Sequence, residues 1–269
     1  MRWAQPFLIC VALSLAATEA TAASRGALIW DGEYWTFGYG ALEQGLAAGG
    51  ANPVERASVL PADLSAYNLV IVVLPSSTPD AAATDALVDF VAGGGALVLV
   101  SDFEGYAPEP SGIFNAMLTD YDVDARFGPG TIYNCSSIVT TSPHPLMAGV
   151  VELHGAASDF IVPGPATEII VQALAQEPIL AVERNIVLLG DSNAINDYVC
   201  APAGPNGPFF ANLPAFACDI DGDGVSNGSC DGDDPNDLDP AVSGDDGGSG
   251  GEESGGDTTT TTDPTGEPG

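Results

Sequence analysis

Two continuous apolar runs, joined by a segment with helix signals, constrain the fold of this chain most strongly. Residues 69–74 form a largely β-branched run stopped by Pro75, and residues 96–100 form a second buried run. Strands that are apolar on both faces lie in the centre of a parallel sheet. The segment between the runs begins with Thr78, a residue that can cap a helix, and ends at three glycines. The sequence therefore predicts a β-α-β unit.

Shorter patterns on both sides of this unit complete the domain. Further strands are expected at residues 27–30, 169–173, 179–182 and 186–189, and further helices at residues 39–48, 113–118 and 209–216, the last interrupted at Pro214. Residues 105–164 are rich in proline and, apart from the helix expected at residues 113–118, predict only short strands. Strands that alternate with helices form a mostly parallel sheet with helices on its faces. The expected fold class is therefore α/β.

The two ends of the chain differ in composition from its middle. Residues 1–23 have a basic start, a short apolar stretch and a small-residue cleavage site, which are the features of a secretory signal peptide. Residues 24–217 form the α/β domain and residues 218–240 an acidic segment. Residues 241–269 form a Gly, Ser, Thr and acidic tail that cannot bury enough surface to order itself. We expect a secreted or cell-surface protein with a disordered tail and no integral membrane segment.

The charge balance excludes two classes of partner. The 269-residue chain has 5 Lys+Arg against 37 Asp+Glu, a formal net charge of −32. Proteins that bind nucleic acids or anionic membranes need a basic surface, since phosphate binding releases counterions only to cationic side chains. We therefore expect no nucleic-acid partner.

The cysteines depend on the expected export, because disulfides form in oxidising compartments. Cys10 leaves with the signal peptide, and four cysteines remain. Four cysteines allow three pairings, and we favour Cys135 with Cys200 and Cys218 with Cys230, since each is the more local choice. A tetrahedral zinc site is the alternative, although no CxxC pair or nearby histidine supports it.

Four sequence blocks carry a resemblance to a known superfamily. They are the opening strand with Asp31-Gly32, LSAYNLVIVVLPSS at residues 64–77, LVDFVAGGGALVLVSD at residues 87–102 and VLLGDSNAIND at residues 187–197. The region resembles the class I glutamine-amidotransferase-like superfamily, and most of all its non-catalytic members in secreted bacterial proteins, gliding-associated transport components and intraflagellar-transport proteins. The resemblance implies a flavodoxin-like fold.

The same resemblance implies which catalytic residues to look for. Catalytic amidotransferases have a nucleophilic cysteine on a tight turn after a central strand, and a His-x-Glu pair late in the domain. Residues 98–105, VLVSDFEG, occupy the first position without a cysteine, and the late pair is also missing. Acyl transfer needs both a nucleophile and its base. We therefore expect a scaffold rather than an enzyme.

Several carboxylates and serines follow predicted strands and are candidates for a ligand-binding crevice. They are Asp31, Ser101, Asp102, Asp191 and Ser192. The carboxyl ends of strands in an open α/β sheet line the crevice where ligands bind, and an acidic crevice would suit a sugar or a cation. The alternative is that these residues are ordinary turn and capping residues.

A secreted serine hydrolase acting on an ester or glycan substrate is the alternative function. It would use Ser101 or Ser192 with a histidine brought close by folding, since triads occur in several chain orders. The two histidines of the chain are His144 and His154, both upstream of Ser192. No complete catalytic constellation is evident along the sequence.

The acidic segment contains the most specific ligand pattern. DIDGDGVSN at residues 219–227 places oxygen ligands at alternate positions around a glycine turn, and calcium takes roughly six to eight hard oxygen ligands. The candidate ligands in this pattern are Asp219, Asp221, Asp223, the carbonyl of Val225 and Asn227. A complete EF-hand would have a bidentate Glu at position twelve of the loop, where this chain has Cys230.

This segment resembles the metal-binding repeats of MopE-like bacterial surface proteins and thrombospondin type 3 calcium repeats. In both, a second acidic cluster completes the coordination begun by the first, so the resemblance implies Asp231, Asp233 and Asp234 as further ligands. An acidic linker without fixed geometry is the alternative. We expect calcium as the cofactor of a non-enzymatic binding or structural module, with a cell-surface glycan or protein as a further partner.

Overall fold

The computed structural model describes residues 26–31, 38–139, 142–173, 176–197, 204–222, 226 and 230. The predicted signal peptide and the predicted tail, residues 241–269, lie outside these residues. Most of the acidic segment, residues 218–240, does so as well. The described part of the chain therefore comprises the α/β domain and the start of the acidic segment.

Nine strands and four α-helices form the described part of the chain. The strands are β1 (Gly26–Asp31), β2 (Val54–Ala57), β3 (Tyr67–Val73), β4 (Ala96–Val100), β5 (Arg126–Val139), β6 (Glu152–Val162), β7 (Glu168–Gln172), β8 (Pro178–Glu183) and β9 (Ile186–Leu189). The helices are α1 (Gly40–Ala48), α2 (Ala81–Ala92), α3 (Pro108–Asp120) and α4 (Gly207–Phe216), with short 3-10 helices η1 (Pro145–Met147), η3 (Ser192–Ala194) and η4 (Gly204–Asn206).

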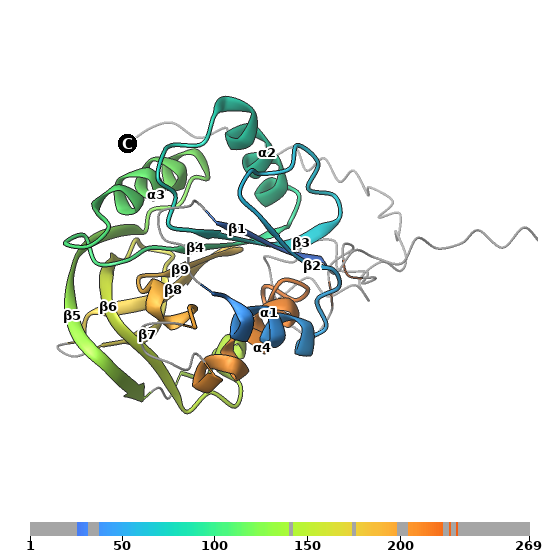
Figure 1. Cartoon of the computed structure of the whole chain (residues 1–269). Helices are drawn as coiled ribbons and strands as arrows, with labels where there is room; N and C mark the ends of the chain where they lie inside the picture. Colours follow the sequence, from blue (N-terminus) through green and yellow to red (C-terminus); the bar gives the residue numbers. More distant parts are fainter. Residues whose placement is uncertain are drawn as a thin grey trace, which may run out of the picture.

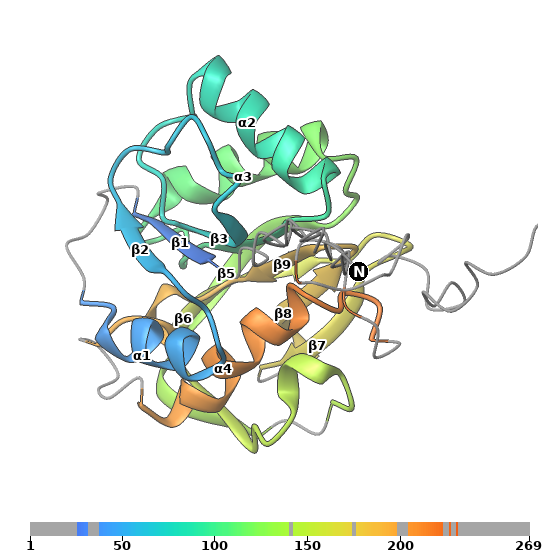
Figure 2. The same cartoon turned by 90° about the vertical axis from the view of Figure 1, so that its right-hand side faces the viewer.

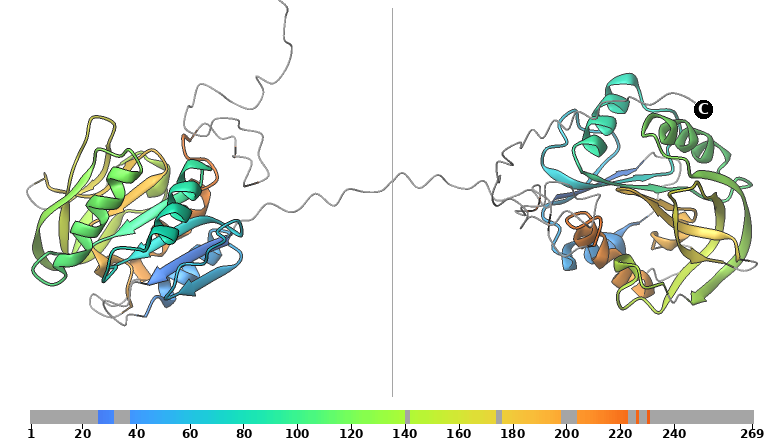
Figure 3. Two further views of the ribbon diagram at one scale, coloured as in Figure 1. Left: turned by 90° about the horizontal axis from the view of Figure 1, so that it is seen from above. Right: turned by 180° about the vertical axis from the view of Figure 1, so that it is seen from behind.

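Seven strands form one sheet in the order β2-β1-β3-β4-β9-β8-β7. Neighbouring strands from β2 to β9 pair in parallel, and β8 is antiparallel to both β9 and β7. Helices α2 and α3 cover one face of the sheet, and α1 and α4 cover the other (Figures 1 and 2). Figure 3 shows α2 and α3 over the sheet from above. The predicted α/β class with a mostly parallel sheet is confirmed.

The sheet separates two hydrophobic cores, as the apolar runs of its central strands require. Along β1, Ala27 and Ile29 belong to the core under α1 and α4, while Leu28 and Trp30 belong to the core under α2 and α3. All four side chains are buried. Because successive side chains of a strand point to opposite faces, a strand buried on both faces must be apolar throughout.

The predicted β-α-β unit is present as β3, α2 and β4, but the cap of its helix differs from the prediction. The side chain of Asp80, rather than Thr78, caps α2, and its carboxylate accepts a hydrogen bond of 2.9 Å from the backbone N–H of Ala83. Aspartate is among the best capping residues because its oxygen satisfies an N–H group that the helix leaves free.

Three further predictions need correction. The helix expected at residues 113–118 is present within the longer α3, whereas the short strands expected elsewhere in residues 105–164 are replaced by a long antiparallel hairpin of β5 and β6. The edge strand β2, whose side chains are half-buried or exposed, was not predicted because it lacks an apolar run. Pro214 lies inside α4 and does not interrupt it.

Helix α1 is capped by a residue far away in the sequence. The Asp197 carboxylate accepts hydrogen bonds of 2.6 Å from the Gly40 N–H and 3.0 Å from the Ala41 N–H. Tyr39, at the helix start, makes no side-chain capping hydrogen bond. Asp197 therefore joins the loop after β9 to the first turn of α1.

Replacing Asp197 by Ala should lower the free energy of unfolding by about 1–2 kcal/mol, since an N-cap and its favourable charge at the helix start contribute about that much. Urea denaturation followed by tryptophan fluorescence would measure the loss. Asp85→Ala, an exposed position within α2, is the control. A loss for Asp197→Ala no larger than that for Asp85→Ala would contradict this capping role.

Candidate functional site

The carboxyl ends of β4 and β9 bring four of the five predicted crevice residues together. Ser101 and Asp102 directly follow β4, and Asp191 and Ser192 follow the neighbouring strand β9. The Ser192 hydroxyl donates a short hydrogen bond to Oδ2 of Asp102. Asp102 also accepts a 2.6 Å hydrogen bond from the Phe103 N–H.

The fifth predicted residue, Asp31, lies apart from this group. It ends β1, and β3 separates β1 from β4 in the sheet. Its carboxylate forms an ion pair with Arg56 of β2, whose guanidinium lies 4.6 Å from the ring centre of Tyr39. Asp31 therefore belongs to the β1–β2 edge rather than to the polar group at β4 and β9.

The β5–β6 hairpin adds a third aspartate, Asp159, that sequence reasoning missed. Its carboxylate accepts a 2.7 Å hydrogen bond from Ser101 Oγ and a short one from Ser111 Oγ. The Glu104 N–H donates to it over 3.0 Å. Asp159 interrupts an apolar stretch of β6, and this interruption is the signal that could have singled it out.

The same hairpin supplies the hydrogen-bond donors around Asp191. Tyr133 of β5 donates its hydroxyl in a short hydrogen bond, and Ala156 of β6 donates its N–H over 2.7 Å. The other carboxylate oxygen accepts a 2.8 Å hydrogen bond from the Asn193 N–H, which caps η3. We call Asp102, Asp159 and Asp191, with Tyr133 and the serines Ser101, Ser111 and Ser192, the carboxylate cluster.

Burial and mutual repulsion hold the cluster partly protonated at neutral pH. Burial, and then the negative charge of Asp191, raise the pKa of Asp102 to about 8. Burial raises the pKa of Asp191 to about 6, against the lowering effect of its hydrogen bonds from Tyr133 and Asn193. Burial also raises the pKa of Asp159. A neighbouring negative charge in a low-dielectric site makes ionisation of a carboxylate more costly.

The three carboxylates of the cluster, together with Ser101 and Ser192, are closed to solvent. Ser101 and Ser192 are 0% exposed, Asp191 is 1% and Asp102 is 5% exposed. Both serine hydroxyls donate to carboxylates, so neither points into open space. This arrangement ties the ends of β4 and β9 to the hairpin.

Neither histidine reaches the serines among the described residues. Nδ1 of His144 accepts from the Leu146 N–H over 3.2 Å, and its ring lies against Phe216. Nε2 of His154 lies 2.9 Å from Glu152. Burial lowers the pKa of His144, with an opposing effect from the Glu168 carboxylate. The serine hydrolase hypothesis thus gains no nucleophile–base pair from these contacts.

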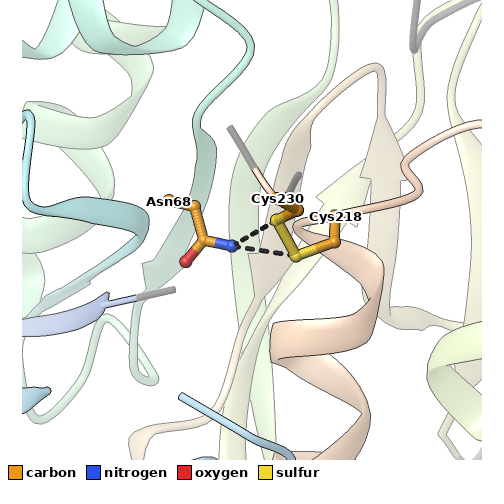
Figure 4. The surroundings of a disulfide bond; sticks show 3 residues. All are labelled: Asn68, Cys218 and Cys230. Carbon is orange, nitrogen blue, oxygen red and sulfur yellow. Dashed lines mark hydrogen bonds between the residues drawn. A yellow bond between two sulfur atoms is a disulfide. The ribbon is translucent and has the colours of Figure 1, made fainter. Parts of the chain in front are cut away.

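The predicted disulfide between Cys218 and Cys230 is confirmed, and it fastens the start of the acidic segment to the core. Both cysteines are buried, and Nδ2 of Asn68, at the start of β3, lies 3.1 and 3.0 Å from their two sulfurs (Figure 4). Cys135 is also disulfide-bonded, and its predicted partner Cys200 lies outside the described residues.

The calcium ligands fall mostly outside the described part of the chain. Asp219 and Asp221 are described, whereas Asp223, Val225, Asn227, Asp231, Asp233 and Asp234 are not. Within the residues that the structure describes, no group of three or more His, Cys, Asp or Glu side chains is arranged to hold a metal ion. Calcium binding therefore stays a prediction from ligand spacing.

The sequence predicts no integral membrane segment. In the described part of the chain, no helix has both the length and the apolar character needed to cross a bilayer.

Comparisons with known proteins place the chain by its fold. No family model matches the sequence, and no curated protein does so. Among solved structures, the mmIFT52 N-terminal domain is similar with a TM-score of 0.55 and 12% identity over 71% of this chain and 96% of that domain. At this identity, the likeness shows a shared fold and nothing more.

Two other structures align at lower scores. A ThuA-like protein from Bacteroides uniformis ATCC 8492 has a TM-score of 0.48 at 15% identity, over 78% of this chain and 97% of that one. A glutamine amidotransferase has a TM-score of 0.44 at 13% identity, over 70% of this chain and 98% of that one.

Proposed function

We propose that this chain is an exported, non-enzymatic binding or structural module at or outside the cell surface, whose acidic segment binds calcium. The non-enzymatic part of this proposal rests on the burial and hydrogen bonding of Ser101. By the resemblance, Ser101 and Asp102 follow the strand where catalytic amidotransferases have their nucleophile. The Ser101 side chain is fully buried, and its hydroxyl donates to Asp159.

A hydroxyl that is closed to solvent is out of reach of an external substrate. It would need both an exposed face and a base able to accept its proton. Burial raises the pKa of Asp159, and Ser111 and Glu104 already donate to it. These contacts support a structural role for the carboxylate cluster.

The disulfide supports the calcium part of the proposal. Cys218 and Cys230 are 12 positions apart and enclose the DIDGDGVSN pattern at residues 219–227. Closing a loop restricts the conformations of the unbound chain, so clustered carboxylates lose less entropy when they surround an ion. Calcium would also neutralise aspartates that otherwise repel one another.

Calcium titrated into the chain from residue 24 to residue 269 should bind at about one site, with a Kd between about 10⁻⁶ and 10⁻³ M. Asp219→Asn/Asp221→Asn should weaken binding at least about tenfold, because two charged ligands are lost. Isothermal titration calorimetry measures both affinities, and protease cleavage within residues 219–239 should slow when calcium is present.

The matched control removes the same charge elsewhere. Glu109→Gln/Asp120→Asn changes two exposed carboxylates of α3, and we call it the α3 control. It should bind calcium within about twofold of the original chain, since screened charges at a distance act weakly. Equal weakening in both variants, or no heat on titration, would overturn the calcium proposal.

A further inference from the structure

Two neighbouring cavities lie along α2, on the face of the sheet that this helix covers. The first, of about 470 Å³, lies between α2 and the chain before β3 and includes Asn68 in its lining. The second, of about 670 Å³, includes Trp30 at the end of β1. Ala62, Ala86 and Asp89 line both cavities. We call the pair the α2 groove.

The α2 groove combines an apolar floor with an acidic rim. Trp30, Leu60 and Leu64 are buried lining residues. The carboxylates at the rim come from Asp63, Asp80, Asp85 and Asp89, all of which are exposed. Among the described lining residues, none is an arginine, a lysine or a histidine. The groove therefore offers apolar contact and negative charge together.

Asn68 adds an unused acceptor to the first cavity. Its side chain is 1% exposed, and its Nδ2 is turned toward the two disulfide sulfurs. Its Oδ1 points away from the sulfurs (Figure 4) and has no hydrogen-bond partner within the described part of the chain. A buried carbonyl without a donor is costly. A ligand N–H group would remove that cost only where the cavity wall shifts to expose this buried oxygen.

The carboxylates of the first cavity are also acceptors, and its hydroxyl groups already donate to carboxylates. One carboxylate oxygen of Asp63 accepts a 2.9 Å hydrogen bond from the Ser65 N–H, and hydrogen bonds from Ser65 lower the pKa of Asp63. The Tyr67 hydroxyl is occupied, because it donates to Glu55 over 2.5 Å. The aromatic ring of Phe90 lies directly against Gly95. A Cβ atom added at position 95 would lie 2.3 Å from this ring.

We propose that the α2 groove binds a basic peptide segment of a partner protein, with an arginine side chain in the cavity lined by Asp63, Asn68 and Asp89. A guanidinium group carries several N–H donors in one plane, pairs with carboxylates and stacks on aromatic rings. This inference rests on the binding role proposed above and names its partner class. It does not depend on calcium.

The size of the groove and the charge of the chain favour a peptide. The 12 residues of α2 span about 18 Å at about 1.5 Å per residue, a length that several extended residues would occupy. The formal net charge of −32 would also attract a cationic partner over long range.

The test uses acetyl-Leu-Arg-Ala-Leu-Arg-amide, with the same peptide carrying citrulline in place of arginine as the neutral control. Fluorescence anisotropy of the labelled peptides measures binding. A salt concentration of about 0.15 M screens unspecific attraction between distant charges. The arginine peptide should bind at least about tenfold more tightly than the citrulline peptide, since charge-assisted hydrogen bonds are the stronger ones. The nuclear magnetic resonance signals of the Asn68 side-chain amide and the Gly95 backbone amide should shift.

Asp63→Asn/Asp89→Asn should weaken binding of the arginine peptide at least about tenfold, and the α3 control less than about twofold. Asparagine at position 63 keeps an acceptor for the Ser65 N–H, so the fold should persist. Equal weakening in both variants, signal shifts confined to other surfaces, or no saturable binding would overturn the inference. A calcium titration of Asp63→Asn/Asp89→Asn separates the two proposals, because the calcium affinity should remain unchanged.

Discussion

Replacing Asp102 by Asn should stabilise the protein in mildly alkaline solution. The free energy of unfolding should also depend much less on pH there. Burial and the neighbouring Asp191 charge raise the pKa of Asp102 to about 8 in the folded state, while the unfolded chain has the ordinary value. The folded state therefore binds the Asp102 proton more tightly. Stability from this group is fully present below the unfolded pKa and falls as the pH rises through about 8.

The size of this effect follows from the linkage between pKa and stability. Between pH 7 and 8.5, the original protein should lose about 1 kcal/mol of unfolding free energy through Asp102. Asparagine carries no titrating proton but keeps an oxygen for the Phe103 N–H. At pH 8.5, Asp102→Asn should be more stable than the original protein by about 2 kcal/mol or more, since a buried ionised carboxylate is costly.

Urea denaturation at several pH values between 7 and 8.5 measures this difference. His144 interferes little in this window, because burial lowers its pKa. The α3 residue Asp120, which is exposed, provides the control substitution Asp120→Asn. If Asp102→Asn and Asp120→Asn lost stability with rising pH as steeply as the original protein, the raised pKa of Asp102 in the folded state would be refuted.

The central sheet could be predicted because its strands are long apolar runs. The apolar runs at residues 69–74 and 96–100 are compatible with few structures other than a strand buried on both faces. The structure places them in β3 and β4. The hairpin of β5 and β6 was missed for the opposite reason. In β6, buried and partly exposed positions are mixed, and two register shifts interrupt its pairing with β5, so no clean period-two pattern appears.

The sequence predicted only those residues of the candidate site that follow predicted strands along the chain. Ser101, Asp102, Asp191 and Ser192 follow adjacent parallel strands, and parallel strands end at one edge. Asp159 and Tyr133 reach the same place from a hairpin whose position no local pattern encodes. The ion pair between Asp31 and Arg56 depends on β2, an edge strand without a strong strand signal.

Replacing Asp191 by Ala should be among the most destabilising single substitutions in the domain. The carboxylate accepts hydrogen bonds from the Tyr133 hydroxyl, the Ala156 N–H and the Asn193 N–H, and the residue is 1% exposed. Its loss would leave buried donors without partners and open a small cavity. Each orphaned donor costs about 1–3 kcal/mol, so the expected loss is about 3–5 kcal/mol. Urea denaturation at pH 7 measures it.

Asp197→Ala is the matched comparison, because it removes an aspartate from the same loop at a position where the hydrogen bonds are solvent-exposed. Asp191→Ala should cost at least about 2 kcal/mol more, since buried donors cannot turn to water instead. Hydrogen exchange gives an independent readout, because the Ala156 amide should exchange faster in Asp191→Ala. Equal losses in the two variants, with unchanged exchange at Ala156, would mean that Asp191 does not hold the β5–β6 hairpin against the sheet.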